Sequence, residues 1–97
     1  MTDSEKLARM FKLLSVDTRV HMIRLLKRRC LCVNALARDL QITPAAVSQH
    51  LRVLRDAGIV TADKRGYFVH YCVNKKMLAH WQEAADSLLR TDEQKDS

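Results

Sequence analysis

The sequence is poor in residues that make turns and in residues with aromatic rings. Its 97 residues include two Gly and one Pro, and aromatic residues make up 5 %. This scarcity disfavours an all-β fold with many turns and favours helices. No apolar run approaches the roughly 18 residues that a membrane span needs, and the polar segment 1–6 predicts no signal peptide. We therefore expect a single cytoplasmic domain of residues 1–97 with no membrane segment.

Cysteine is also scarce, and its number is odd. The chain has Cys30, Cys32 and Cys72. An odd number of cysteines without an export signal argues against a disulfide framework and predicts mostly reduced thiols.

Charge is plentiful and uneven. The formal net charge is +6, from 17 Lys and Arg against 11 Asp and Glu. Residues 1–18 sum to zero, residues 19–76 to +9 and residues 77–97 to −3. A basic central segment between two ends without net positive charge indicates a polyanionic partner that contacts the middle of the chain.

Apolar residues recur at helical spacing in five segments, which are residues 5–14, about 17–28, 33–40, 44–57 and 75–90. Residues 28–32 are interpreted as a connection. Thr43 and Pro44 suit the N-cap and first position of the fourth helix, and Gly58 suits its end. Residues 59–61 and 67–73 are rich in β-formers and predict a hairpin whose turn, residues 63–66, is basic. The predicted fold class is mainly α (α+β), a winged helix–turn–helix with a two-stranded wing.

The fourth predicted helix has two distinct faces. Val47, Leu51 and Leu54 form an apolar stripe, and a polar face of small or hydrogen-bonding residues lies opposite. A helix that enters the major groove of DNA needs such a face. The helix N-terminus and the hairpin tip would add phosphate contacts. The candidate DNA-binding residues are Thr43, Ala45, Ser48, Gln49, Arg52, Lys64 and Arg65.

Several short stretches between residues 7 and 82 have a specific pattern and an uninterrupted spacing: Asp17-Thr18-Arg19, Leu36-Ala37, residues 47–54, residues 57–60, Arg65-Gly66 and Tyr71. In these stretches residues 7–82 resemble the ArsR/SmtB group of bacterial winged helix–turn–helix repressors. The similarity implies a homodimer that joins through the helices of residues 1–16 and 75–90, binds double-stranded operator DNA, and is released by an inducer. Residues 91–97 would form a polar tail.

Cys30 and Cys32 stand at the start of the third predicted helix, directly after three cationic residues. This setting favours the thiolate, which binds soft metal ions and reacts with oxidants. Arsenic-sensing relatives carry a Leu-Cys-Val-Cys-like motif here. The chain matches it at residues 31–33 and has Asn34 where the second cysteine would stand. Cys72 would complete a site for a metal ion or for As(III) if the wing strand approaches this helix.

The sequence is compatible with three roles for Cys30 and Cys32: metal or metalloid sensing, thiol redox sensing, and no sensory role. The other common metal site of the family is half present, as His80 and Glu83, and we expect no zinc there. No other histidine is expected to be a ligand, His70 included. His50 and Trp81 are expected to pack rather than to bind a ligand.

Other classes of function fit less well. The cysteines have no base and no oxyanion site in an identifiable motif, so we expect no enzyme. A winged-helix protein-interaction module without a DNA role is an alternative, because the fold alone does not fix function. A constitutive repressor without sensing by the cysteines is a second alternative.

Overall fold

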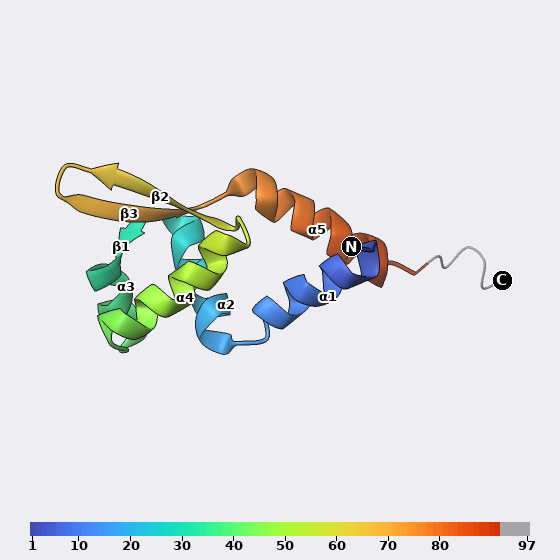
Figure 1. Ribbon diagram of the computed structural model, residues 1–97, viewed down its shortest axis with the longest axis horizontal. Coiled ribbons are helices and arrows are strands. Elements are labelled where there is room, and N and C mark those ends of the chain that lie inside the picture. Colours follow the sequence, from blue (N-terminus) through green and yellow to red (C-terminus); the bar gives the residue numbers. More distant parts are fainter. Residues whose placement is uncertain (92–97) are drawn as a thin grey trace.

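The computed structural model describes residues 1–91, which form five helices and one three-stranded antiparallel sheet (Figure 1). The predicted winged helix–turn–helix class is confirmed. None of the helices within residues 1–91 is both long and apolar enough to cross a membrane. Most of the tail predicted at 91–97 lies outside the described residues. The elements in chain order are α1 (Asp3–Leu13), α2 (Asp17–Arg28), β1 (Leu31–Cys32), α3 (Val33–Leu40), α4 (Pro44–Asp56), β2 (Val60–Arg65), β3 (Phe68–Val73) and α5 (Lys75–Leu89).

Local side-chain contacts set the ends of several helices. The Thr43 hydroxyl accepts a hydrogen bond from the Ala46 amide at 3.1 Å, and Pro44 occupies the first turn of α4. Gly58 follows α4 with φ +79°, the left-handed region that glycine enters at least cost. Asn74 caps α5. These positions agree with the helix bounds that the sequence predicts.

The core lies where α2, α3 and α4 meet the sheet. The apolar stripe of α4 is at its centre, with Val47, Leu51 and Leu54 all between 0 and 2 % exposed. Burial of each such side chain stabilises the fold by about 1.5–3 kcal/mol. This packing fixes how α4 is rotated and therefore which side chains of α4 face solvent.

The hairpin turn is shorter than predicted. Arg65 pairs with Phe68 in the β2–β3 register, so Gly66 and Tyr67 alone form the turn. Gly66 has φ +63°, as a tight two-residue turn requires. Asp63 and Lys64 consequently belong to β2 rather than to a loop.

A third strand extends the hairpin. Residues 31–32, which the sequence assigns to a connection, pair with β3 as Leu31 with Tyr71 and Cys32 with His70. The strand order is β1-β3-β2, so β3 is central. Two residues are too few to show a strand period in the sequence.

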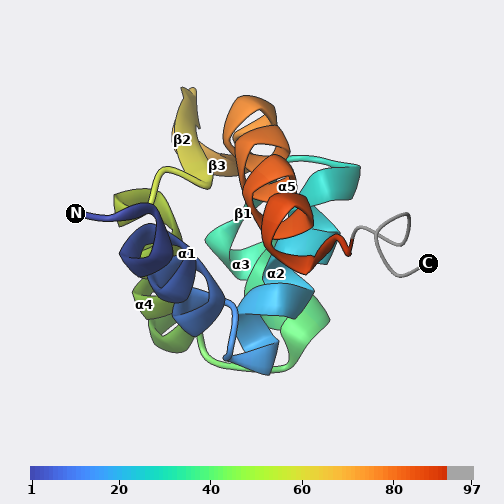
Figure 2. The same ribbon diagram turned by 90° about the vertical axis from the view of Figure 1, so that its right-hand side faces the viewer.

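Helices α1 and α5 lie side by side at the end of the molecule away from the wing tip (Figures 1 and 2). In the single chain α5 has no buried residue within its 15 residues. Phe11, Leu88 and Leu89 are 38, 55 and 69 % exposed. The two terminal helices thus leave apolar surface uncovered.

Candidate nucleic-acid interface and cysteine cluster

Helices α3 and α4 form the helix–turn–helix. Gln41 ends α3 in the left-handed conformation with φ 57°, and the Ile42 amide donates to the Ala37 carbonyl at 3.1 Å. Residues 41–43 thus form the tight turn between the two helices, and Thr43 caps α4. Both helices bury apolar residues in one core, so α4 is held as a rigid unit.

The polar face of α4 is exposed along its length. Ala45, Ser48, Gln49 and Arg52 are all exposed, opposite the buried stripe. Ser48, Arg52 and Tyr71 help to line an open hollow of about 490 Å³ between α4 and the sheet. The four α4 residues that the sequence predicts for DNA contact therefore share one exposed face of the helix.

Thr43 is exposed at the N-terminus of α4, but its hydroxyl oxygen already accepts the Ala46 amide hydrogen. The hydroxyl proton remains available to donate. A phosphate at this position would therefore receive a hydrogen bond from Thr43 beside those from the free amides of the first helical turn.

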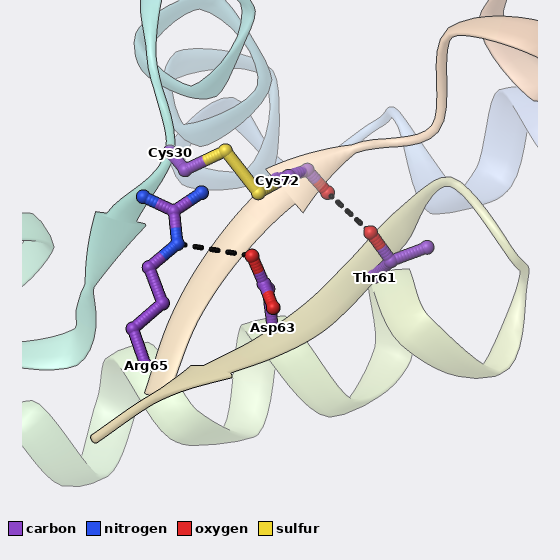
Figure 3. A network of polar contacts seen from close by, with 5 residues as sticks. All are labelled: Cys30, Thr61, Asp63, Arg65 and Cys72. Carbon is purple, nitrogen blue, oxygen red and sulfur yellow. Dashed lines mark hydrogen bonds and ion pairs between the residues drawn. A yellow bond between two sulfur atoms is a disulfide. The ribbon is translucent and has the colours of Figure 1, made fainter. Parts of the chain in front are cut away.

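The two basic residues of the wing differ in their surroundings. Lys64 and Arg65 are both exposed near the turn. Arg65 Nε donates to Asp63 Oδ2 at 2.9 Å, with both side chains about half exposed (Figure 3). An exposed pair of this kind contributes about 0–1 kcal/mol. Arg65 is thus held against the sheet by an interaction that a phosphate can displace.

The sequence reading gave no role to the exposed aromatic residues at the wing tip. Tyr67 is fully exposed and Phe68 is 63 % exposed. The sequence signal for these two residues was their position directly after the turn glycine. The β2–β3 register, which puts the turn at residues 66–67, shows that they lie at the wing tip.

His50 has a packing role, as the sequence suggested. Its Nδ1 accepts a hydrogen bond from Arg19 Nε at 3.3 Å, and this links α4 to α2. Burial, and secondly the charge of Arg19, lower the pKa of His50 below 6.5. The neutral ring is therefore the form that the fold favours. Trp81 also packs, at the edge of the core cluster.

The cysteines differ from the sequence expectation of reduced thiols. Cys30 and Cys72 form a disulfide, with their Cα atoms 4.5 Å apart (Figure 3). The expectation was wrong because the odd total leaves room for one pair. The pairing of β1 with β3 brings residues 30 and 72 opposite each other, although they are 42 positions apart in the chain.

Cys32 keeps a free, half-buried thiol at the N-cap of α3, and its side chain makes no capping hydrogen bond. It pairs with His70, which the sequence analysis did not expect to be a ligand. Nδ1 of His70 is buried and has no hydrogen-bond partner within the described chain. The available signal was the strand alternation that places His70 on the same side of β3 as Cys72.

Metal ligation was the other expectation for the cysteines. The approach of the wing strand to the start of α3 does occur, and Cys30, Cys32 and Cys72 become neighbours. In the disulfide-bonded form, however, no cluster of three or more His, Cys, Asp or Glu within residues 1–91 is placed to hold a metal ion. His80 and Glu83 are both exposed on α5.

Comparison with known proteins agrees with this geometry. The family described as "Bacterial regulatory protein, arsR family" matches residues 17–62, from the start of α2 into β2. The arsenical resistance operon repressor of Escherichia coli is 31 % identical over 87 residues, which are 89 % of this chain and 74 % of that protein.

Two further proteins are similar. The arsenic resistance transcriptional regulator ArsR1 of Pseudomonas putida is 36 % identical over 75 residues, covering 76 % of this chain and 58 % of that regulator. The solved structure of an ArsR-like transcriptional regulator from Rhodococcus sp. RHA1 superposes with a TM-score of 0.77 at 26 % identity, covering 88 % of this chain and 80 % of that one. By fold, by helix–turn–helix geometry and by sequence, this chain belongs to the ArsR/SmtB family of winged helix–turn–helix transcriptional regulators.

Proposed function

We propose that this protein is a cytoplasmic homodimeric repressor that binds double-stranded operator DNA and leaves it when an inducer acts on its cysteines. The observation that carries the DNA-binding part is the continuous exposed face of α4, flanked by the basic wing. In this reading Ser48, Gln49 and Arg52 contact base edges and phosphates. Lys64 and Arg65 contact the adjacent backbone or minor groove.

The experiment is a fluorescence-anisotropy titration of labelled duplex DNA from the region upstream of the coding sequence, with a scrambled duplex of equal length as reference. Wild-type protein should prefer the upstream duplex, and affinity for both should fall steeply as salt rises. Gln49→Ala and Arg52→Ala should reduce the ratio of affinities for the upstream and scrambled duplexes. Lys64→Ala should instead weaken binding to both duplexes by a similar factor. Arg9→Ala, an exposed residue on α1, is the control for loss of a charge. Equal losses on both duplexes for every α4 variant would contradict the assignment of α4.

The dimer is proposed to form through α1 and α5. Met10, Leu14, Leu78 and Trp81 help to line an apolar groove of about 580 Å³ between these helices, and Phe11 lies exposed at its rim. A second copy fits this surface because the terminal segments, residues 1–18 and 77–97, sum to zero and −3, whereas the middle of the chain is strongly basic. Two copies would also present two α4 helices to a DNA site with two-fold symmetry.

Light scattering coupled to size-exclusion chromatography tests this assembly. Wild-type protein should have the mass of two chains, and Phe11→Glu should shift it toward one. Lys12→Glu, which alters the neighbouring exposed side chain, should leave the mass unchanged. A monomeric wild type, or equal effects of both substitutions, would refute the α1–α5 interface.

Release by an inducer is proposed to work through the Cys30, Cys32 and Cys72 thiols. The Cys30–Cys72 disulfide ties the end of α2 to the central wing strand, and this favours a thiol oxidant as one inducer. The same sulfurs suit a soft metal ion or As(III) once they are reduced. The curated relatives include an arsenical and a cadmium resistance regulator.

The titration is therefore repeated with reduced protein, oxidised protein, and reduced protein with arsenite or Cd(II). Release that is lost in Cys30→Ser or Cys32→Ser would support sensing by the affected residue. Binding that is indifferent to all conditions would establish a repressor without cysteine sensing. Binding with no preference for the upstream duplex would favour a protein-interaction module.

A further inference from the structure

We infer that His70 joins Cys30, Cys32 and Cys72 in a four-ligand site for a thiophilic divalent cation such as Zn(II) or Cd(II), and that the disulfide and the metal ion exclude each other. The inference rests on the proposed sensing role of the cysteines and adds a ligand from the wing strand. It also makes the oxidation state of the protein the condition for metal binding.

The sheet register places the four side chains together. The Cα separation of 4.5 Å between Cys30 and Cys72 is that of an antiparallel pair without direct hydrogen bonds. This type recurs two residues along, at the pair of Cys32 with His70. Because paired residues share a face and successive residues alternate, all four side chains lie on the same face of the sheet. Leu31 and Tyr71 point to the other face, where both belong to the core cluster.

The spacing suits one metal ion. Opposite Cβ atoms in an antiparallel pair are about 4.5–5.5 Å apart, and diagonal neighbours are about 7–8 Å apart with their Cβ atoms somewhat closer. Bonds of about 2.3 Å to sulfur and about 2.0 Å to nitrogen let four such side chains converge on a central cation. Three thiolates and one imidazole are a common tetrahedral donor set for zinc.

The buried ring nitrogen of His70 is an independent observation. A buried nitrogen without a hydrogen-bond partner carries an uncompensated free-energy cost of desolvation, and nearly all such atoms in folded proteins have a partner. Nδ1 of His70 has none among residues 1–91. Coordination of the ring would recover part of this cost, either through Nδ1 itself or by ordering its surroundings.

The disulfide and the metal ion compete for the same sulfur atoms. Two electrons and two protons from a dithiol reductant convert the Cys30–Cys72 disulfide into two thiols, and the reductant becomes a cyclic disulfide. Binding of a divalent cation then displaces three protons, one from each cysteine, and leaves a site with net charge −1. In the oxidised form two of the three sulfurs are bonded to each other, and residues 1–91 assemble no metal-binding group.

The new negative charge would lie close to the wing residues. Asp63 is paired with His70, and the Asp63–Arg65 ion pair lies on the same side of the sheet as the disulfide (Figure 3). An anionic metal site would attract the Arg65 guanidinium further toward the sheet and away from a DNA phosphate. Metal loading would thus weaken DNA binding through a residue of the proposed interface.

The test is an anaerobic titration of phosphine-reduced protein with Cd(II). The sulfur-to-cadmium charge-transfer absorbance reports thiolate ligands, and a competing chelator provides the affinity. We expect one Cd(II) per chain with three thiolates, no such binding to oxidised protein, and a loss of one thiolate in Cys32→Ser. His70→Gln should weaken binding by about tenfold or more, equivalent to about 1.4 kcal/mol or more.

His80→Gln is the matched control, because it removes an exposed histidine and also tests the α5 position. Equal affinity of His70→Gln and wild type would overturn the role of His70, and fewer than three thiolates would overturn the site. Equal binding by oxidised protein would overturn the exclusion. None of these readouts involves DNA. The metal site can therefore be confirmed even if the proposed repressor function is refuted, and it can be refuted even if that function is confirmed.

A second measurement uses the rate of disulfide formation in place of the affinity for metal. Reduced protein with and without one equivalent of Cd(II) is exposed to a diamide oxidant, and mass spectrometry follows formation of the Cys30–Cys72 disulfide. Bound metal should slow this reaction at least about tenfold relative to the metal-free chain, and the His70→Gln variant should lose most of the protection. Equal rates with and without Cd(II) would contradict the proposal.

Discussion

Reduction of the Cys30–Cys72 disulfide is expected to lower the free energy of unfolding substantially. The bond joins residues 42 positions apart. In the chain-entropy description, closing a loop of this length restricts the unfolded state by about 4 kcal/mol at 25 °C, and measured effects of disulfides are typically about 2–4 kcal/mol. A domain of this size has a total stability of about 5–15 kcal/mol. Reduction would therefore remove a large part of it.

The assay is urea unfolding followed by circular dichroism, with and without a phosphine reductant, at one fixed chain concentration because a dimer would add to the stability. With slopes of about 1–3 kcal/mol per molar urea, the midpoint should fall on the order of 1–3 M on reduction. Cys32→Ser should show the same fall as wild type, and the double variant Cys30→Ser with Cys72→Ser should be indifferent to reductant. A difference between oxidised and reduced wild type below about 1 kcal/mol would refute the reasoning, because it would mean that the bond does not restrict the unfolded chain as calculated.

Four further predictions each address one residue. Gly58→Ala should destabilise the fold by about 1–3 kcal/mol in urea unfolding, because the left-handed backbone is costly for alanine, and the new Cβ would lie 3.1 Å from a core methionine methyl group. Gly66→Ala should cost less than Gly58→Ala, because its φ is also positive but no atom lies within 4 Å of the new Cβ; the reverse order would contradict this. His50 has a pKa below 6.5 in the fold, so the unfolded state binds more protons and stability should decline as pH falls below about 6.5. His50→Gln should flatten that decline, and an unchanged pH profile would show that another group causes it. Asp63→Asn frees Arg65 from its ion pair and removes a negative charge, so it should tighten binding to operator and scrambled duplexes alike; tightening on the operator alone would argue for a direct contact with bases.

Features that arise from contacts within a few residues can be predicted from the local sequence. Thr43 and Pro44 start α4 and Gly58 ends it, because caps and backbone preferences act locally. The period of apolar residues then determines which face of α4 is buried. For this reason the exposed set that includes Gln49 and Arg52 could be predicted without coordinates.

The arrangement of the cysteines, by contrast, depends on packing between distant segments of the chain. The bond between Cys30 and Cys72 and the neighbourhood of Cys32 and His70 depend on the pairing of β1 with β3, a contact between segments about 40 residues apart. A two-residue strand carries no periodic signal, and its register follows from where the core places Leu31. The hairpin turn lies at Gly66 and Tyr67 rather than at the predicted residues 63–66. Cross-strand pairing, and not local turn preference, sets its length. Short-range preferences thus position the helices, whereas the identity of a site built across strands depends on the packed core that brings distant residues together.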